Sequence, residues 1–241
     1  MLFVGNNSIY LQNSLDEQYN KVGILLKGEG ANGSTTFYDS GPKKFVSTSA
    51  TMSVNTSTYK KFGSGSIYQN GTNMGITFPS SSTWATFDSS EWTFECWFYM
   101  PNGWDTVNKI FEFSLNTNGP NFNISQTGMS VYTGNNSFVA STSAANVSSS
   151  TWHHYVCQKN TSTNATTTSS IDFFLNGVRY NTTTPSSNGW KAGSAQAFVV
   201  GRPDGAPRST HAFDEYRVTM GVARYKGLNS FTVPDREYGI A

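Results

Sequence analysis

The residues of this chain with the most chemical potential lie near its end, between Ala212 and Lys226, where the sequence reads AFDEYRVTMGVARYK. The acidic pair Asp214-Glu215 stands inside a run with the residue types of a β-strand, and a short hydrophobic segment with two basic residues follows it. A carboxylate inside a strand is costly unless it meets a cation or a hydrogen-bond donor. The segment therefore predicts either a bound metal ion or a structural clasp near the end of a β domain.

A second set of carboxylates has residue types suited to hydrolysis, but its spacing is wrong. A retaining glycosidase needs two carboxyl groups about 5–5.5 Å apart, whereas Glu91 and Glu95 share a strand face about 13 Å apart along the chain. Glu112 stands alone. His153 and His154 are adjacent strand residues that point to opposite faces and cannot hold one ion jointly. We therefore predict that the protein is not an enzyme.

The composition indicates which elements position these residues. The chain has 241 residues, of which 15% are aromatic and 13% are charged, below the roughly 25% charged residues of typical soluble domains. Ser, Thr, Asn and Gly fill the remaining polar positions, which suits short strands joined by turns. A net charge of +1 argues against a nucleic acid partner. No apolar run reaches the roughly 18 residues of a membrane span, so we expect no membrane insertion.

Strand-like runs recur along the whole chain without a convincing helix. The strongest are 92–100 (WTFECWFYM), 152–158 (WHHYVCQ) and 171–180, where Asn176-Gly177 is the preferred type I′ hairpin turn. Both faces of 92–100 are apolar, so this strand is either covered on both sides or carries a binding surface on its outer face. Further strands are expected at 22–26, 65–69, 74–78, 109–114, 121–125, 129–133, 197–201 and 213–219. Ten or more short strands predict one β-sandwich or barrel.

Only residues 1–20 look separable, because they lack a repeating pattern and precede the first strong strand. We divide the chain into an N-terminal arm, 1–20, which docks elsewhere or holds copies of the chain together, and a β domain, 21–241. Deleting the arm is expected to leave the domain folded. The arm has no basic leader or long apolar run, so we expect no signal peptide and synthesis in a cytoplasm. Cys96 and Cys157 stand mid-strand among aromatic residues, and whether they pair is open.

Seven segments carry a family resemblance: LLKGEGANGSTTFYDSG (25–41), KFGSGSIYQNGTNMGITFP (61–79), WTFECWFY (92–99), TWHHYVCQ (151–158), FFLNGVRY (173–180), AFVVGRP (197–203) and AFDEYRVTMGVARYKG (212–227). In this order they resemble the laminin-G-like jelly roll of the concanavalin A-like lectin/glucanase superfamily. Each motif alone is unspecific, but together they cover roughly residues 22–238. The resemblance implies an all-β, antiparallel jelly-roll β-sandwich.

Within this superfamily, the ending DEYRVTMGVARYKGLNSFTVP (214–234) most resembles domains of bacteriophage virion proteins, especially tail fibres and surface adhesins. The resemblance implies a non-catalytic virion surface protein, made in the host cytoplasm, that acts as tail fibre, adhesin or capsid decoration and binds host-surface carbohydrate. Its partners would be other virion proteins, the host glycan and further copies of itself in a homo-oligomer. A purely structural capsid or tail component without a glycan ligand stays open, and so does a polysaccharide hydrolase.

The resemblance also implies a structural calcium ion (Ca2+), which is common in the family. An Asp of the first turn and a late Asp would be ligands, and these correspond to Asp39 and Asp214, with Glu29 and Asn32 as neighbours. Calcium takes roughly six to eight oxygen ligands, so two carboxylates and backbone carbonyls would form a partial set. The alternative is that Asp39 caps a turn and that Asp214 pairs with Arg217 or a backbone amide.

A glycan site would require exposed aromatic faces flanked by polar groups. Turn-like stretches rich in Asn, Ser and Gly offer the aromatic candidates Trp84, Trp104, Tyr132 and Trp190, with Arg202 and Asp204 as polar contacts. The competing interpretation is that these rings fill the ends of the sandwich.

Overall fold

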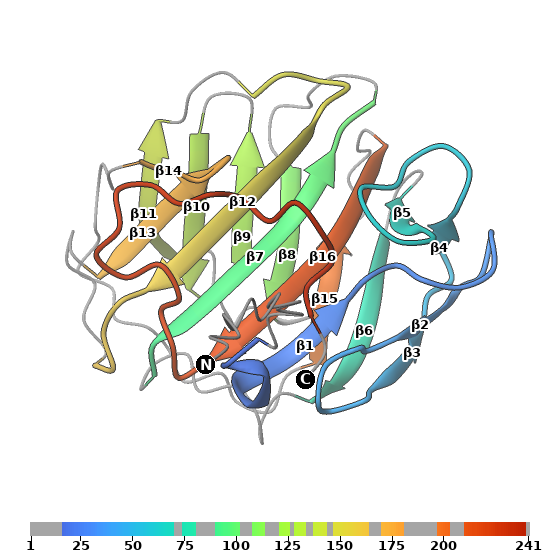
Figure 1. The fold of residues 1–241 in the computed structure, drawn as a ribbon, viewed down its shortest axis with the longest axis horizontal. Coiled ribbons are helices and arrows are strands. Elements are labelled where there is room, and N and C mark those ends of the chain that lie inside the picture. The colour runs from blue at the N-terminus through green and yellow to red at the C-terminus, as the bar shows by residue number, and fades with distance from the viewer. Residues whose placement is uncertain are drawn as a thin grey trace, which may run out of the picture.

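The computed structural model describes residues 16–69, 74–80, 90–101, 108–113, 121–125, 128–133, 137–143, 147–163, 170–180, 197–202 and 210–239. Within these ranges the strands form sheets of eight and six strands and a two-stranded ribbon, and the only helical element is the 3-10 helix Tyr19–Lys21. The two larger sheets lie one behind the other as two layers (Figure 1). The predicted all-β antiparallel sandwich is thus confirmed.

The large sheet contains eight of the described strands. Its strand order is β14 (Val178–Tyr180), β13 (Ile171–Leu175), β12 (Trp152–Lys159), β7 (Trp92–Tyr99), β16 (His211–Met220), β5 (Ser66–Gln69) and β4 (Met52–Asn55), and β1 (Val22–Leu26) also pairs with β16. The strand predicted at 92–100 lies at the centre of this sheet, as its apolar pattern indicates. Asn176 and Gly177 both have positive φ, at 50° and 78°, which confirms the predicted hairpin turn.

The small sheet forms the second layer. Its order is β11 (Ser137–Ser143), β10 (Gly128–Thr133), β9 (Asn121–Ser125), β8 (Asn108–Phe113), β15 (Ala197–Arg202) and β6 (Met74–Ser80). The ribbon of β2 (Thr36–Tyr38) and β3 (Val46–Thr48) lies beside β6, where the Ser49 hydroxyl donates to the Gly75 carbonyl at 2.9 Å.

The core lies between the two sheets and follows the period-2 alternation of β7. Trp92, Phe94, Cys96 and Phe98 all belong to the buried core cluster. The Phe94 ring stacks on Phe122 of β9 with centroids 5.2 Å apart, so the two layers interlock through aromatic contacts. Both cysteines of the chain are buried and free.

The other face of β7 is covered by the end of the chain. Residues 221–239, here named the C-terminal strap, cross the front of the large sheet in red (Figure 1). The Thr93 hydroxyl donates to the Val222 carbonyl and accepts from the Arg224 amide, both at 2.9 Å. Further along, the Phe231 amide donates to the Gly177 carbonyl at 2.9 Å. Around Thr93, the central strand is therefore covered on both faces.

The predicted boundary after residue 20 is wrong, because residues 16–20 are part of the sandwich. The Tyr19 hydroxyl donates to the Ser40 carbonyl at 2.9 Å, and Asp16 forms ion pairs with Arg217 and Arg224. A spacing pattern could not reveal the ion pairs of Asp16, since their partners are 201 and 208 positions away. A separable arm can therefore extend no further than residue 15. In the described ranges, no helix is long and apolar enough to cross a membrane.

Candidate functional site

The acidic pair Asp214-Glu215 forms a β-bulge in β16. The register of β16 against β7 shifts between Asp214 and Arg217, and Glu215 has a positive φ of 49°. Such a bulge re-aims side chains. Phe213 and Tyr216 enter the core, whereas Asp214, Glu215 and Arg217 all make contacts outside it.

The two carboxyl groups of the bulge bind backbone amides. Asp214 Oδ2 accepts from the Lys61 and Phe62 amides, each at 3.0 Å. Glu215 Oε2 accepts from the Tyr238 amide at 2.8 Å. Asp214 therefore fastens the loop before β5, and Glu215 fastens the end of the strap. Of the two roles predicted for the acidic pair, the structure shows the clasp.

Burial raises the pKa of both carboxyl groups, to about 7 for Asp214 and to about 8 for Glu215. Their backbone hydrogen bonds oppose this shift, while the nearby Glu237 carboxylate adds to it. The unfolded chain loses these protons at about pH 4, whereas the folded chain keeps them to higher pH. The pair therefore makes the folded state less stable as the pH rises from about 4 to about 8.

We expect a Glu215→Gln variant to gain stability relative to the wild type as the pH rises from about 5 to about 8, because glutamine has no proton to lose. Urea unfolding at a series of pH values in EDTA measures this difference. The variant is compared with the wild type because burial also lowers the pKa of His153 and His154, and both proteins share that contribution. Asp235→Asn, at an exposed carboxylate, is the matched control. A difference independent of pH would contradict the prediction.

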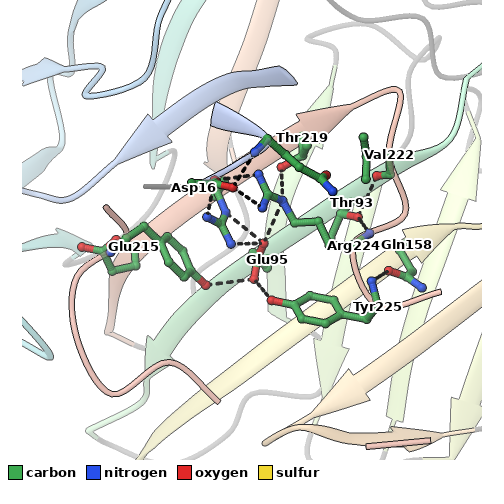
Figure 2. A network of polar contacts seen from close by, with 12 residues as sticks. Asp16, Thr93, Glu95, Gln158, Glu215, Thr219, Val222, Arg224 and Tyr225 are labelled. Atoms are coloured by element: carbon green, nitrogen blue, oxygen red, sulfur yellow. Dashed lines mark hydrogen bonds and ion pairs between the residues drawn. The ribbon is translucent and has the colours of Figure 1, made fainter. Parts of the chain in front are cut away.

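A buried ionic network lies under the strap, centred on Glu95 (Figure 2). Glu95 is 0% exposed. Its Oε1 accepts from Arg217 Nε at 2.9 Å and Nη2 at 2.8 Å. Its Oε2 accepts from the hydroxyls of Tyr225 at 2.7 Å and Tyr238 at 2.9 Å. One carboxylate on the central strand thus holds β16 and two points of the strap.

The charge of Glu95 is compensated where it lies. Burial alone would raise the pKa of Glu95, but Arg217, His154 and Arg224 hold it well below its ordinary value. The Arg217 guanidinium lies over the Tyr238 ring, 3.6 Å from its centroid, which adds a cation–π contact. Glu95 is therefore an anion with a full set of donors.

Asp16 completes the network from the other end of the chain. Its carboxylate accepts from Arg217 Nη1 at 2.9 Å and from Arg224 Nη1 and Nη2 at 2.8 Å each (Figure 2). The two arginines face two carboxylates, so the buried charges balance. Balanced, hydrogen-bonded charges are the arrangement in which buried ions persist.

The network leaves the sequence-based case against hydrolysis intact. Glu95 binds four donor groups, and Glu91 pairs with Lys226 Nζ at 2.6 Å. His154 Nε2 lies 2.9 Å from the Tyr238 hydroxyl under the strap. These side chains are engaged in contacts that hold the strap in place. Glu112 lies in β8, and its side chain is outside the described residues.

Each of the four residues of the predicted metal site accepts hydrogen bonds from backbone amides. Asp39 Oδ1 accepts from the Leu25 and Gly41 amides, each at 2.8 Å, which is the turn-capping alternative. Asn32 Oδ1 accepts from the Thr56 amide at 3.0 Å, and Glu29 Oε1 from the Ser64 amide at 3.3 Å. In the described part of the chain, no group of three or more His, Cys, Asp or Glu residues is arranged to hold a metal. Calcium binding stays a prediction. Comparing the melting temperature of the protein in calcium with that in EDTA would test it.

Most of the predicted glycan-binding residues fall outside the part of the chain that the structure describes. These are Trp84, Trp104, Trp190, Asp204 and the side chain of Arg202, of which only the backbone, in β15, is described. Tyr132 is half-buried in β10, opposite Phe138 of β11. The sequence-based glycan site stays a prediction.

Sequence reasoning missed the partners that complete the network. Asp16, Arg224, Tyr225 and Tyr238 lie in segments that carry no strand pattern. One signal was present, because Glu95 interrupts the most aromatic strand of the chain. A carboxylate at such a position requires a cation, and two arginines follow in the acidic-pair segment.

A family model of the concanavalin A-like lectin/glucanases superfamily matches residues 70–222, which is more than half of the chain. No curated protein matches the sequence. The family match agrees with the antiparallel sandwich of the structure.

Several solved structures share the fold at low sequence identity. The binding domain of Paraclostridial mosquitocidal protein 1 has a TM-score of 0.62 and 12% identity, over 86% of this chain and 51% of that one. A structure of botulinum neurotoxin type C, whose cell entry is described as dependent on interaction with two ganglioside molecules, has a TM-score of 0.60 and 10% identity. The match covers 84% of this chain and 48% of that one. Trypanosoma rangeli sialidase has a TM-score of 0.53 and 9% identity, over 83% of this chain and 30% of that one. The chain thus spans about half of the two toxin chains and under a third of the sialidase.

Proposed function

We propose that this chain, which belongs to the concanavalin A-like lectin/glucanase superfamily, is a non-catalytic surface protein of a bacteriophage particle that binds carbohydrate on the host. The observation that carries the non-catalytic part is the engagement of Glu95, whose two oxygens hold Arg217 and two tyrosines beneath the strap. Because the superfamily contains both lectins and glucanases, its members either bind carbohydrate or hydrolyse it. A carboxylate that is 0% exposed cannot reach a glycosidic bond in solvent, which favours binding.

Carbohydrate binding draws support from the kinds of protein that share this fold. The toxin chains include a binding domain and a neurotoxin studied for its interaction with gangliosides. The Trypanosoma sialidase is the example that favours an enzyme, and the sandwich matches less than a third of that protein. Binding is therefore the better inference for a chain built of the sandwich.

The virion role rests on the resemblance of residues 214–234 to phage tail-fibre and adhesin domains. Most of this segment lies beyond residue 222, where the family match ends, and it forms the strap. We propose that the chain acts in the virion as a homo-oligomer, with other virion proteins and a host glycan as partners.

We expect the intact chain to bind at least one glycan on a printed array of bacterial surface polysaccharides and mammalian glycans, and to release no reducing ends from it. Running the array in calcium and in EDTA tests the calcium prediction separately. The absence of binding in both conditions would favour the purely structural virion role, and release of reducing sugar would favour the hydrolase.

A further inference from the structure

Four aromatic side chains form a continuous row on the large sheet, at the end of β7 away from Glu91 and Thr93. Trp152 of β12 pairs with Tyr99 of β7, and the two ring centroids are 5.4 Å apart. Tyr99 pairs with Ala212 of β16, which pairs with Tyr68 of β5. Four neighbouring strands therefore contribute to one line across the sheet.

Tyr59 fills the interruption that Ala212 leaves in this line. Its ring centroid lies 5.3 Å from that of Tyr99 and 5.4 Å from that of Tyr68, on which it stacks with an interplanar angle of 14°. Contact therefore runs without a break through Trp152, Tyr99, Tyr59 and Tyr68. We name this set the aromatic row.

The aromatic row is held in place and still reaches solvent. The Tyr59 amide donates to Asn55 Oδ1 at 3.0 Å, and the Tyr59 carbonyl accepts from the Ser66 hydroxyl. All four rings are half-buried, whereas Ala212 beneath them is 0% exposed. Rings fixed by neighbours before a ligand arrives lose little conformational freedom on binding.

We propose that the aromatic row is a carbohydrate-binding platform for a short, uncharged oligosaccharide. This inference rests on the proposed function and assigns it to residues other than those predicted from the sequence. Sugar rings stack their apolar C–H faces on aromatic rings, and phenol hydroxyls at the ring edges supply hydrogen bonds. Half-exposed tyrosines and a tryptophan offer both.

The dimensions of the row favour an oligosaccharide. From β12 to β5 it crosses three strand spacings of about 4.8 Å each, or about 14 Å in all. This length suits several linked sugar rings better than one. Its flanks carry neutral hydroxyls, since Ser53 pairs with Tyr68 across β4 and β5 and Thr210 hydrogen-bonds to the Tyr68 hydroxyl.

The charge distribution favours an uncharged ligand. Glu95, Arg217 and Arg224 are gathered at the strap-covered part of the sheet, where they compensate one another. Only 13% of the chain is charged. Single-stranded nucleic acid also stacks on aromatic rings, but it requires a basic groove that follows its backbone. Lys60 and Lys61 follow Tyr59 in the chain, and the ammonium group of Lys61 lies over the Trp97 ring, 4.1 Å from its centroid.

The test compares binding by the wild type and by Tyr59→Ala, Tyr99→Ala and Trp152→Ala variants. Calorimetric titration uses the glycan that binds the wild type most strongly on the printed array. Each alanine variant is expected to weaken binding about three- to tenfold, which corresponds to one aromatic contact. Tyr59→Phe and Trp152→Phe keep a ring and should retain most of the affinity.

Two controls separate loss of the platform from loss of the fold. Tyr38→Ala removes a tyrosine that is 61% exposed on the β2–β3 ribbon and should leave affinity unchanged. Tyr59→Ala changes a loop residue, so its melting temperature should stay close to that of the wild type while its affinity falls.

The outcomes distinguish this inference from the proposed function. If the wild type binds glycan and all three alanine variants bind equally well, the row is not the site, although the chain remains a lectin. If the wild type binds no glycan, both proposals are wrong. Saturable binding of a proline-rich peptide without glycan binding would overturn the ligand class, because such peptides also dock on aromatic surfaces.

Discussion

A Glu95→Ala variant is expected to lose about 3–5 kcal/mol of unfolding free energy, the usual cost of removing one partner from a buried ion pair. The substitution leaves the Arg217 guanidinium, with a side chain only 6% exposed, without its main counter-charge. It also removes the acceptor of the Tyr225 and Tyr238 hydroxyls, which fasten the strap. Urea unfolding at neutral pH measures the loss.

Glu91→Ala is the matched control, because Glu91 precedes β7 on the same side and also pairs with a strap lysine. The side chain of Lys226 is 56% exposed, and a solvent-exposed pair contributes about 0–1 kcal/mol. We therefore expect Glu95→Ala to lose much more unfolding free energy than Glu91→Ala, although the two glutamates are four positions apart. Equal losses for both variants would show that the network around Glu95 does not hold the strap.

An Asp16→Asn variant is expected to lose about 2 kcal/mol of unfolding free energy. Arg217 and Arg224 share the Asp16 carboxylate, and without it Glu95 is the one remaining anion of the network for two cations. The expected loss is smaller than for Glu95 because the side chain of Asp16 is 10% exposed, whereas that of Glu95 is 0% exposed. Glu17→Gln, at the exposed neighbouring carboxylate, is the control and should have little effect. Urea unfolding of both variants provides the comparison.

The same ion pairs predict the response to acid. Hydrogen bonding and charge from Arg224 and Arg217 outweigh burial and lower the pKa of Asp16, and the pKa of Glu95 is lowered as well. Their stabilisation is therefore complete above the unfolded pKa values of about 4 and is lost as the pH falls through the lower folded values. In Asp16→Asn, the unfolding free energy should therefore fall less steeply than in the wild type as the pH is lowered below about 4.

Truncation then locates the boundary of the arm. Deleting residues 1–15 should leave the domain as stable as the full chain, whereas deleting residues 1–20 removes Asp16 and should destabilise it. If both truncations are equally stable, Asp16 contributes nothing to the fold. The shorter deletion also tests whether residues 1–15 are needed for incorporation into particles.

The strands found from the sequence are those with strong local signals. The strand 92–100 alternates large apolar residues, and Asn176-Gly177 is a turn that few other residue pairs form readily. The ribbon strands β2 and β3 and the edge strand β4 were missed, because their Ser- and Thr-rich segments resemble loops. Their stability comes from packing and from contacts such as the bond from Ser49 to the Gly75 carbonyl.

The network and the aromatic row could not be read from the sequence for a different reason. Arg224 and Asp16 are 208 positions apart, and the row collects rings from three strands and a loop. Local periodicity predicts which face of a strand a residue occupies, but the register between strands decides which residues meet. The sequence therefore predicted that Asp214 acts as a clasp or a ligand without identifying its partners, the Lys61 and Phe62 amides.

Carbohydrate binding without hydrolysis is tested most directly by titrating the intact chain with the strongest glycan from the array and then analysing that glycan. We predict saturable binding and recovery of the glycan with no new reducing ends. No binding to any glycan, or cleavage of the one that binds, would contradict the proposed function.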